Sequence, residues 1–373
     1  MLENQATERL AIVMPVYNEG ETIAKTVEEI NEKVMRYLPN SSILIFEDGS
    51  KDNTKEVLNS LAAKYPWVKV HTSPQRKGYP TAVRDALNAI DEDRFDYVVF
   101  VDSDGQYYPE DFFRLWDAMK KGEPDIVMAQ RRNRSEPLYR VVLSSGLRLL
   151  ERLLFDPPCN DVTSAFRIMK VHVAKSVAAK VRYSKYNFWL EFTARAAMLG
   201  YTFSEVPVSY RSREGGESNV YSFRKMPRVI ASELGAILRT WWSYKKSEIV
   251  KFVGVGASGA AIIIAVTDAL TSLAGYYYVL SAAIGIEASI IWAFILNDRW
   301  TFQKTRKSHR WHTRFLRYNL ISLVGLAINE SLLVLFTEIF GIYYLASEIF
   351  AIIFTFAFNY IANVKWTWHR PIS

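Results

Sequence analysis

The chain has 373 residues, too many for one ordinary domain, and its two halves differ in composition. A net charge of +7 could suggest a nucleic-acid partner, but the Lys and Arg residues of the second half lie between long apolar runs, where membrane proteins carry them. The single cysteine, Cys159, excludes an internal disulfide framework and a cysteine-rich zinc site. We therefore expect a cytosol-facing catalytic half, a membrane half and no nucleic-acid partner.

The first part of the chain alternates apolar runs of strand length with segments of helical periodicity. Strand-like runs start at Leu10, Ser42, Val68 and Tyr97, and each of the first three is followed by a segment with helical spacing. This alternation predicts an α/β fold with a mostly parallel sheet and helices on both faces. The expected domains are residues 1–224, a linker with interfacial helices at 225–247, and a membrane domain at 248–373.

Polar residues follow three of these strand-like runs directly. They lie at positions 17–19, at positions 47–48, and at Asp102 and Asp104, which end a continuous apolar run. The crossover rules for parallel sheets bring such ends to one edge, where ligands usually bind. Two carboxylates there could share a divalent cation with substrate phosphates. A second Asp-x-Asp, at residues 91–93, follows no strand and is expected to lack this role.

A group of arginines follows a fifth strand-like run at residues 125–129. Arg131, Arg132 and Arg134 come at its end, and Arg140 and Ser144 open the next helix. Arginines gathered at a strand end would repel one another without an anion. Arginine binds phosphate oxygens through a bidentate fork, and a serine at a helix start adds a hydroxyl donor. We expect a phosphate site here, with Arg132 and Arg134 left to the surface.

Four motifs in the first half of the chain resemble, in order and spacing, those of glycosyltransferase family 2 enzymes, which have the Rossmann-like GT-A fold. Within that family the chain is most similar to the polyprenyl-phosphate hexose synthases. The motifs are Pro15-Val16-Tyr17-Asn18-Glu19, Glu47-Asp48-Gly49-Ser50-Lys51-Asp52-Asn53-Thr54, Arg76-Lys77-Gly78 and Asp102-Ser103-Asp104-Gly105-Gln106. The resemblance covers essentially the whole first half. Asp161-Val162-Thr163-Ser164-Ala165-Phe166-Arg167 resembles a further family segment, but has Ala165 where glycine or serine is common. The processive members of this family carry a Gln-x-x-Arg-Trp sequence. This sequence does not occur in the chain, so a single transfer per acceptor is indicated.

The resemblance implies a role for each matching residue. Mg²⁺ or Mn²⁺ would be held by Asp102, Asp104 and Gln106. The nucleotide sugar would be bound by Pro15, Tyr17, Glu19, Asp48, Lys77, Asp102, Asp104, Gln106, Arg213 and Ser218, the last two in a glycine-rich lid. The acceptor phosphate would be bound by Arg131, Arg140 and Ser144, and the residues near the sugar would be Asp161, Ser164 and Glu191. Asp104 and Arg131 would be catalytic. Glu191 is otherwise expected to be a solvated residue on the surface of a helix.

Four spans long enough for the roughly 20 residues of a bilayer core follow, at about 249–271, 276–296, 315–340 and 343–362. The loop between the second and third spans is basic, whereas the two opposite loops hold no Lys or Arg. By the positive-inside rule, the catalytic domain and both termini of this multi-pass protein of the cell membrane are cytoplasmic. Residues 226–244 predict a helix at the membrane interface, with a domain-packing helix as the alternative.

The membrane half contains an internal repeat. Asn297 recurs as Asn363, and the segment at 300–302 recurs at 366–368, each 66 positions later (363 minus 297). Two equivalent helical hairpins are expected, and their Asn-x-x-Trp-Thr-aromatic motif resembles the GtrA-like four-helix module. Ionisable or polar residues in or near the spans are expected to face the bundle interior, namely Asp268, Glu287, Asn329 and Glu330.

Together these features predict an inverting, metal-dependent glycosyltransferase that moves one hexose from a nucleotide sugar to dolichyl or polyprenyl phosphate. The resemblance to mannose synthases favours GDP-mannose as the donor, and UDP-glucose is the alternative. A rival hypothesis of another class is a lipid-linked sugar flippase whose first half senses nucleotide sugars. That hypothesis leaves Asp102, Asp104 and Arg131 without chemistry.

Overall fold

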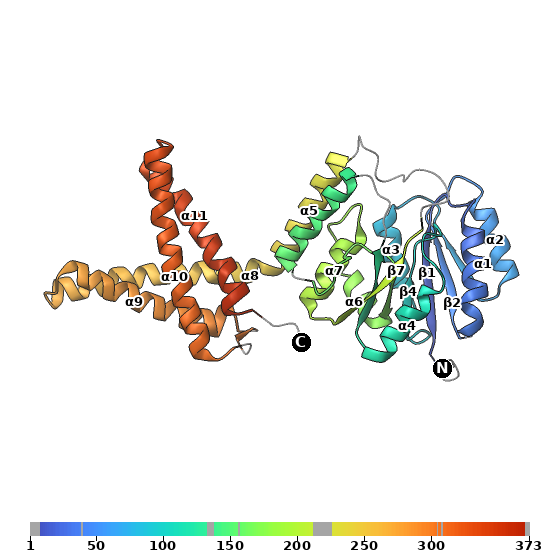
Figure 1. Ribbon diagram of the computed structural model, residues 1–373, viewed down its shortest axis with the longest axis horizontal. Coiled ribbons are helices and arrows are strands. Elements are labelled where there is room, and N and C mark those ends of the chain that lie inside the picture. Colours follow the sequence, from blue (N-terminus) through green and yellow to red (C-terminus); the bar gives the residue numbers. More distant parts are fainter. Residues whose placement is uncertain are drawn as a thin grey trace. The chain divides into compact units, whose positions relative to one another are not determined.

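The computed structural model describes residues 8–38, 40–132, 138–155, 157–211, 226–303, 305–306 and 309–369, with the backbone alone for residues 138–144. In the described part of the first half, strands form a single sheet in the order β3-β2-β1-β4-β6-β5-β7 (Figure 1). Their bounds are Leu10–Val16 (β1), Ser42–Glu47 (β2), Val68–Thr72 (β3), Tyr97–Phe100 (β4), Ile126–Arg132 (β5), Arg167–Lys170 (β6) and Phe203–Ser209 (β7).

Strand direction confirms the predicted mostly parallel sheet. β1 runs parallel to β2 and to β4, β2 to β3, and β5 to β7. Only β6 among these strands is reversed, and it pairs antiparallel with β4 and with β5. The carboxyl ends of β1, β2, β4 and β5 therefore lie along one edge, which is where the polar motifs follow the strands.

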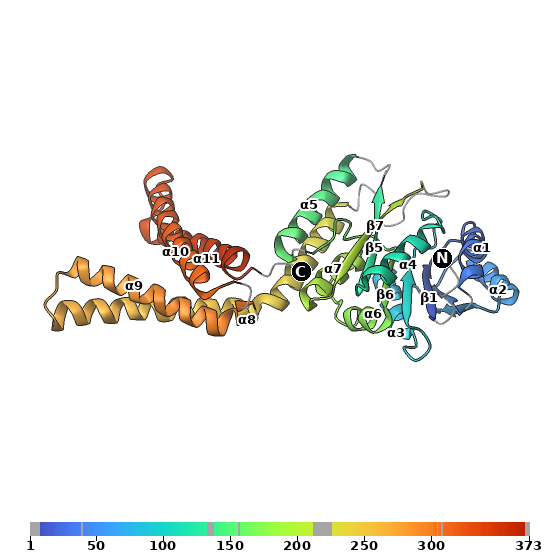
Figure 2. The ribbon, with the colours of Figure 1, turned by 60° about the horizontal axis from the view of Figure 1, so that its bottom comes forward.

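Helices cover both faces of the sheet, and the alternation of buried side chains along β1 shows how (Figures 1 and 2). Ala11 and Val13 pack in one hydrophobic cluster with α3, α6 and α7, whereas Ile12 and Met14 pack in another with α1, α2 and α4. All seven residues of β1 are buried, as expected for a central parallel strand. The helix bounds are Ile23–Lys33 (α1), Thr54–Lys64 (α2), Tyr79–Ala89 (α3), Asp111–Gly122 (α4), Leu138–Phe155 (α5), Val171–Ala178 (α6) and Phe188–Leu199 (α7), with a short 3-10 turn at Met35–Tyr37.

The structure divides into two compact units, Met1–Ser243 and Tyr244–Ser373. The helix α8 (Met226–Asp268) belongs to both, because it continues without a break through the position where the composition changes. Residues 226–244 and the first predicted span, expected as separate segments, thus form one helix. No glycine or proline occurs between Ser243 and Val250 to end the helix, and Lys245 instead pairs with Glu248 one turn later at 2.9 Å.

In the second unit, each long α-helix ends in a π-helical turn. α8 is followed by η2 (Ala269–Leu273), α9 (Tyr278–Leu296) by η3 (Asn297–Thr301), α10 (Trp311–Val334) by η5 (Leu335–Ile339), and α11 (Tyr344–Ala362) by η6 (Asn363–Thr367). Four described helices are long and apolar enough to cross a membrane. Large apolar side chains on them are exposed, as lipid-facing surfaces require, and Leu273 is the most open at 87%. The protein is a membrane protein.

The predicted repeat is confirmed by the backbone. η5 begins 66 positions after η2, and η6 begins 66 positions after η3 (335 minus 269, 363 minus 297). The glycines that follow η2 and η5, Gly275 and Gly341, both have positive φ angles, of 71° and 66°. The two helical hairpins are therefore equivalent in backbone as well as in sequence.

Polar contacts join the helices of the second unit. Arg314 forms an ion pair with Asp298 at 2.7 Å, and the indole N–H of Trp368 donates to the same carboxylate at 3.0 Å. Elsewhere, the Tyr360 hydroxyl donates to Glu248 at 2.7 Å. In an apolar surrounding an unpaired charge would be expensive, so these contacts specify which helices meet.

Candidate active site

The turns after β1 and β2 hold each other in place. Asn18 adopts a left-handed conformation (φ 53°), its backbone N–H donates to Ser50 Oγ at 3.0 Å, and its side-chain oxygen accepts from the N–H of Lys51 at 2.9 Å. Asp52 accepts from the N–H of Gly20 at 3.2 Å. An asparagine suits this position because its short polar side chain tolerates the left-handed region.

Asp48 ties the end of β2 to the basic loop that precedes α3. Its two oxygens accept the backbone N–H groups of Lys77 and Gly78 at 2.7 and 2.9 Å. The loop passes so close that a Cβ on Gly49 would lie 2.6 Å from the Arg76 nitrogen, and Gly49 has a φ of +70°. The Glu-Asp-Gly motif thus has a structural reason, which is to bring the basic loop against the end of β2.

Other predicted donor-site residues also lie on these turns. The Arg76 guanidinium lies over the Tyr17 ring at 3.9 Å. Lys77 Nζ pairs with Asp85 at 2.6 Å, and Glu19 accepts from the Thr22 hydroxyl at 2.7 Å. The structure thus brings Tyr17, Glu19, Asp48 and Lys77 to one edge of the sheet, although the lysine ammonium is occupied by a carboxylate.

The Asp-x-Asp motif directly follows β4 in the same edge region. Ser103 is buried and its hydroxyl donates to the Pro15 carbonyl at 2.9 Å, which joins the motif to β1. Asp102 and Asp104, on either side of it, are partly exposed. Asp102 accepts from the Tyr79 hydroxyl at 2.9 Å, and Asp104 accepts from the N–H of Gln106 at 3.2 Å.

These two carboxylates fit a cation that is shared with a substrate. The described residues contain no group of three or more His, Cys, Asp or Glu side chains arranged around a common metal position. Mg²⁺ commonly takes one or two protein carboxylates and completes its octahedron with water and substrate phosphates. Asp102 and Asp104 match that mode, whereas a cage of protein ligands alone is absent from the part of the chain that is described.

Gln106 joins the Asp-x-Asp loop to the end of β7. Its side-chain oxygen accepts from the Tyr210 hydroxyl at 2.7 Å, and its side-chain nitrogen donates to the Arg211 carbonyl at 3.0 Å. Tyr107 pairs with Tyr210 in an isolated β-bridge. Gln106 could ligate a metal only through its second oxygen lone pair, and its observed contacts give it a structural role.

Arg131, near the end of β5, has an anion partner in the protein. Its Nε and one terminal nitrogen donate to the two oxygens of Asp161 at 2.8 and 2.9 Å, and its backbone N–H also donates to that carboxylate. Both side chains are largely buried, with 12% and 5% exposed. The charge of Arg131 is therefore balanced within the protein, so repulsion among the arginines does not by itself require a phosphate at this residue. A fixed guanidinium can still present its remaining N–H groups to a phosphate.

Ser164 lies between the Asp-x-Asp loop and β6. Its side chain is fully buried and lies 3.5 Å from the Tyr107 hydroxyl, at the limit of a hydrogen bond. Its carbonyl accepts from Arg167, a fully buried side chain whose guanidinium stacks on Trp189 at 4.0 Å. Burial raises the pKa of Tyr107 to about 12, so its hydroxyl keeps its proton at neutral pH.

Glu191 is not the solvated surface residue expected from the sequence. Only 4% of it is exposed, and its carboxylate accepts the backbone N–H groups of Arg182, Tyr183 and Ser184 at 2.7–3.0 Å. Arg195, one turn later on α7, pairs with it at 2.6 Å. These contacts make Glu191 the anchor of the loop before α7, and they leave little capacity for contact with a sugar.

Some predicted site residues cannot be placed. Arg213 and Ser218, expected in the glycine-rich lid, lie outside the described residues. Arg140 and Ser144 lie in α5, where the structure describes their backbone but not their side chains.

Two family models match the chain, one over each half. The first, Glycosyl transferase family 2, matches residues 11–177, and the second, the GtrA/DPMS transmembrane domain, matches residues 251–368. The chain combines a glycosyltransferase family 2 domain with a GtrA/DPMS transmembrane domain. It is therefore a glycosyltransferase of the membrane.

This glycosyltransferase is similar over nearly its whole length to a curated protein. It is 27% identical over 370 residues to the dolichol-phosphate mannosyltransferase of Pyrococcus furiosus, covering 96% of this chain and 99% of that protein. Its first part is 28% identical over 218 residues to the undecaprenyl-phosphate mannosyltransferase of Micrococcus luteus, covering 57% of this chain and 87% of that one. A solved structure of glucosyl-3-phosphoglycerate synthase from Mycobacterium tuberculosis, with Mn²⁺, UDP and phosphoglyceric acid, has a TM-score of 0.48 and 17% identity, covering 63% of this chain and 79% of that one.

Sequence reasoning missed four aromatic residues that shape the glycosyltransferase site. Tyr79 binds Asp102, Trp189 binds Tyr79, and Tyr210 binds Gln106. The rings of Tyr107 and Tyr210 lie 5.1 Å apart, edge to face. Tyr107 could have been suspected because it immediately follows the Asp-x-Asp-Gly-Gln motif. Trp189 and Tyr210 are far from that motif in the sequence, so only the fold reveals their contacts.

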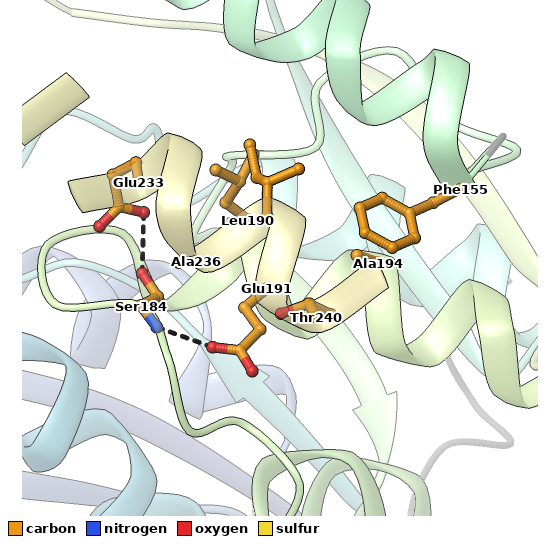
Figure 3. A pocket seen from close by; sticks show the side chains of 9 residues that line it. Phe155, Ser184, Leu190, Glu191, Ala194, Glu233, Ala236 and Thr240 are labelled. Carbon is orange, nitrogen blue, oxygen red and sulfur yellow. Dashed lines mark hydrogen bonds between the residues drawn. The ribbon is translucent and has the colours of Figure 1, made fainter. Parts of the chain in front are cut away.

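A small enclosed cavity of about 10 Å³ lies where α7 meets the first part of α8 (Figure 3). Ser184 stands between two carboxylates there: its hydroxyl donates to Glu233 of α8 and its backbone N–H to Glu191 of α7, at 2.9 and 2.8 Å. Thr240 also lines the cavity, and its buried hydroxyl has no hydrogen-bond partner among the described residues. The space suits one water molecule, which matches the polar walls but excludes a sugar.

Proposed function

We propose that the protein transfers one hexose, with inversion, from a nucleotide sugar to the phosphate of a dolichyl or other polyprenyl lipid. Mannose from GDP-mannose is the favoured donor, and UDP-glucose is the alternative. The observation that carries this proposal is the similarity to a dolichol-phosphate mannosyltransferase, which extends through both domains and nearly the full length of each chain. Membrane helices in the same chain suit an acceptor that stays in the bilayer.

The donor would lie along the carboxyl ends of β1, β2 and β4. Residues at this edge would bind the nucleotide and its diphosphate, namely Pro15, Tyr17, Glu19, Asp48, Lys77, Asp102, Asp104 and Gln106. Asp48 accepts the backbone N–H groups of Lys77 and Gly78 and so fixes the basic loop at the edge where the diphosphate would lie. Mg²⁺ or Mn²⁺ bound by Asp102 and Asp104 would neutralise charge on the diphosphate leaving group. Lys77 would add a positive charge once released from Asp85.

The acceptor phosphate would lie beside Arg131, with Arg140 and Ser144 of α5 as further donors. Asp161 holds the Arg131 fork in one orientation, so the guanidinium is positioned before the lipid arrives. The sugar would lie between this group and the Asp-x-Asp loop, near Asp161 and Ser164. Glu191 is removed from the sugar-binding set, because its oxygens serve the loop before α7.

Chemically, this reaction requires no strong general base. The second pKa of a phosphate monoester is about 6, so the acceptor is already an oxyanion nucleophile at neutral pH. The chain's residues would then act by positioning and by charge stabilisation: Arg131 directs the phosphate oxygen to the anomeric carbon, while the edge near Asp104 holds the departing diphosphate. Attack from the face opposite to the leaving group inverts the anomeric configuration.

The positions of the Lys and Arg residues between the spans indicate on which side of the membrane the reaction would take place. The basic loop between α9 and α10 would face the cytoplasm, together with both termini and the glycosyltransferase domain, in the cell membrane. The start of α8 would lie at the headgroup level, where the exposed ring of Trp242 suits the interface. A lipid phosphate would then reach the site while its polyprenyl tail remains in the bilayer.

The decisive experiment is transfer by the detergent-purified chain. Radiolabelled GDP-mannose and UDP-glucose are each offered with polyprenyl phosphate, and labelled lipid is measured after extraction. We expect labelled lipid from GDP-mannose in the presence of Mg²⁺ or Mn²⁺. Labelled lipid from UDP-glucose alone would change the donor but keep the reaction. If neither sugar is transferred while the native chain binds nucleotide, the flippase hypothesis replaces this proposal.

A further inference from the structure

A chain of hydrogen bonds leads from the core of the sheet to the Asp-x-Asp motif. The Trp189 indole N–H donates to the Tyr79 hydroxyl at 3.0 Å, and that hydroxyl donates to Asp102 at 2.9 Å. Trp189 belongs to α7, Tyr79 is the first residue of α3, and Asp102 follows β4. Three elements that are distant in sequence therefore converge on one carboxylate.

The direction of each hydrogen bond in this chain is fixed by chemistry. An indole nitrogen can only donate, so the Tyr79 oxygen must accept from Trp189. The single proton of the Tyr79 hydroxyl is then available for Asp102, whose ionised carboxylate can only accept. Neither residue has another arrangement that keeps both hydrogen bonds. The Asp102 side chain is therefore held from one side by a donor that cannot turn away.

Trp189 is itself unable to move. Only 1% of it is exposed, its ring lies 4.5 Å from that of Phe100 in β4, and the buried guanidinium of Arg167 stacks on its face at 4.0 Å. Phe100 and Arg167 are paired neighbours on β4 and β6. The indole N–H is thus oriented by the same strands that deliver the Asp-x-Asp motif to the edge of the sheet.

We propose that Tyr79 is a positioning residue for Asp102, with Trp189 acting through it, and that the pair sets the affinity of the site for a divalent cation. This inference rests on the proposed function, because it takes Asp102 as a metal ligand. A donated hydrogen bond withdraws some electron density from a carboxylate, which by itself would weaken its binding of a cation. Fixing the carboxylate acts in the opposite direction, and outer-sphere partners of metal ligands typically contribute about 10–100-fold in affinity. Orientation is therefore expected to dominate.

The test measures Mn²⁺ binding to the full chain in detergent, with a nucleoside diphosphate present to supply the phosphate ligands, by titration calorimetry or by the electron paramagnetic resonance signal of free Mn²⁺. Tyr79→Phe removes one hydroxyl and keeps the ring. We expect it to bind Mn²⁺ about tenfold more weakly than the native chain. The matched control is Tyr201→Phe, which removes another partly buried phenol that donates to Ser176 at 3.3 Å. The control should bind Mn²⁺ with native affinity.

A second variant tests the outer member of the chain. Trp189→Phe removes the indole N–H, so the Tyr79 hydroxyl loses its directing partner, and we expect Mn²⁺ binding to be weaker than in the native chain but stronger than in Tyr79→Phe. If Tyr79→Phe does not fold, the Mn²⁺ affinity of Trp189→Phe still tests the positioning role. Native Mn²⁺ affinity in the folded Tyr79→Phe or Trp189→Phe variant would overturn the positioning role and leave the metal site intact. No Mn²⁺ binding by the native chain would overturn the metal site and this inference together, even if sugar transfer continues.

Discussion

Arg131 and Asp161 form a forked ion pair in which two guanidinium nitrogens reach the two carboxylate oxygens at 2.8 and 2.9 Å. The pair is almost completely buried, and Thr163 adds a contact to the same guanidinium at 2.9 Å. Arg131 thus has a structural role that exists before any lipid phosphate binds. A functional role can be separated from it by removing the two charges one at a time and then together.

The single variant Arg131→Ala leaves the buried Asp161 without its partner, which typically costs about 3–5 kcal/mol of stability. The double variant Arg131→Ala with Asp161→Ala leaves no orphan charge, so we expect its thermal unfolding midpoint to recover most of this loss. If Arg131 binds the acceptor, neither variant should regain transfer to polyprenyl phosphate. Both should keep their affinity for nucleotide sugar.

The contradicting result is specific. A double variant that regains both stability and transfer would show that Arg131 serves only the fold. A variant that keeps the native requirement for lipid phosphate but loses affinity for nucleotide sugar would place Arg131 at the donor instead.

Asp104→Ala tests the expected metal ligand. Asp104 is partly exposed and accepts a local hydrogen bond from the N–H of Gln106, so the variant should remain folded. We expect transfer to be abolished in a folded protein, and a chelator to stop the native enzyme reversibly. Asp93→Ala, in the exposed Asp-x-Asp that follows no strand, is the matched control and should remain active. Full activity of Asp104→Ala in chelator would disprove the assignment.

Glu151 on α5 predicts an unusual dependence of stability on pH. It is fully buried, and neither carboxylate oxygen has a hydrogen-bond partner in the described part of the chain. Burial raises the pKa of Glu151 well above its usual range, and the charge of Arg167 opposes this shift only in part. The native state therefore holds a proton that the unfolded chain releases near pH 4.3, so stability should fall as pH rises from there toward the folded pKa.

Glu151→Gln removes this proton linkage while keeping the shape of the side chain. We expect the variant and the native chain to unfold at similar temperatures near pH 4.5. The variant should be the more stable at pH 7.5, with the difference growing by at most about 1.4 kcal/mol per pH unit. The exposed Glu56→Gln is the control, and its difference from the native chain should not change with pH. If the difference in stability between Glu151→Gln and the native chain were the same at every pH, the Glu151 carboxyl would ionise in the folded protein as it does in the unfolded chain.

Gly49 and Gly146 predict opposite effects of the same substitution. Gly49 has a positive φ and lies against the basic loop, so Gly49→Ala should destabilise the domain by at least about 2 kcal/mol. Gly146 lies within α5 with open space around it, so Gly146→Ala should stabilise the helix by about 0.5–1 kcal/mol. Thermal unfolding of both variants in one detergent checks the signs. A neutral Gly49→Ala would mean that the basic loop can move away.

The fold was largely predictable because its signals are local and repeated. Apolar runs such as Leu10–Val16 and the polar residues after them identify strands and their ends, and the right-handed crossover rule then brings those ends to one edge. The same logic explains why Asp48 and Asp102 could be placed in one region from the sequence alone. The membrane spans could be predicted from the length and composition of the apolar runs alone.

The contacts of individual site residues could not be predicted, because they are made between segments far apart in the chain. Asp161 is 30 residues from Arg131, and no local sequence pattern predicts this ion pair. Glu191 looked solvated because its helix was judged without the loop that folds over it. The continuity of α8 could not be predicted, because the composition changes within the helix and no local signal shows that the backbone continues unbroken.

The repeat in the transmembrane domain has a consequence for how its hairpins assemble. Glu248 and Arg314 occupy equivalent positions, 66 residues apart (314 minus 248), yet carry opposite charges. Their partners are not repeated either: the equivalent of Asp298 is Val364, and that of Tyr360 is Phe294. If one hairpin paired with its own copy, Glu248 would meet Phe294 in place of the Tyr360 hydroxyl, or Arg314 would meet Val364 in place of the Asp298 carboxylate. The two hairpins are therefore complementary to each other rather than to themselves, which favours one unlike pair over a pair of identical hairpins.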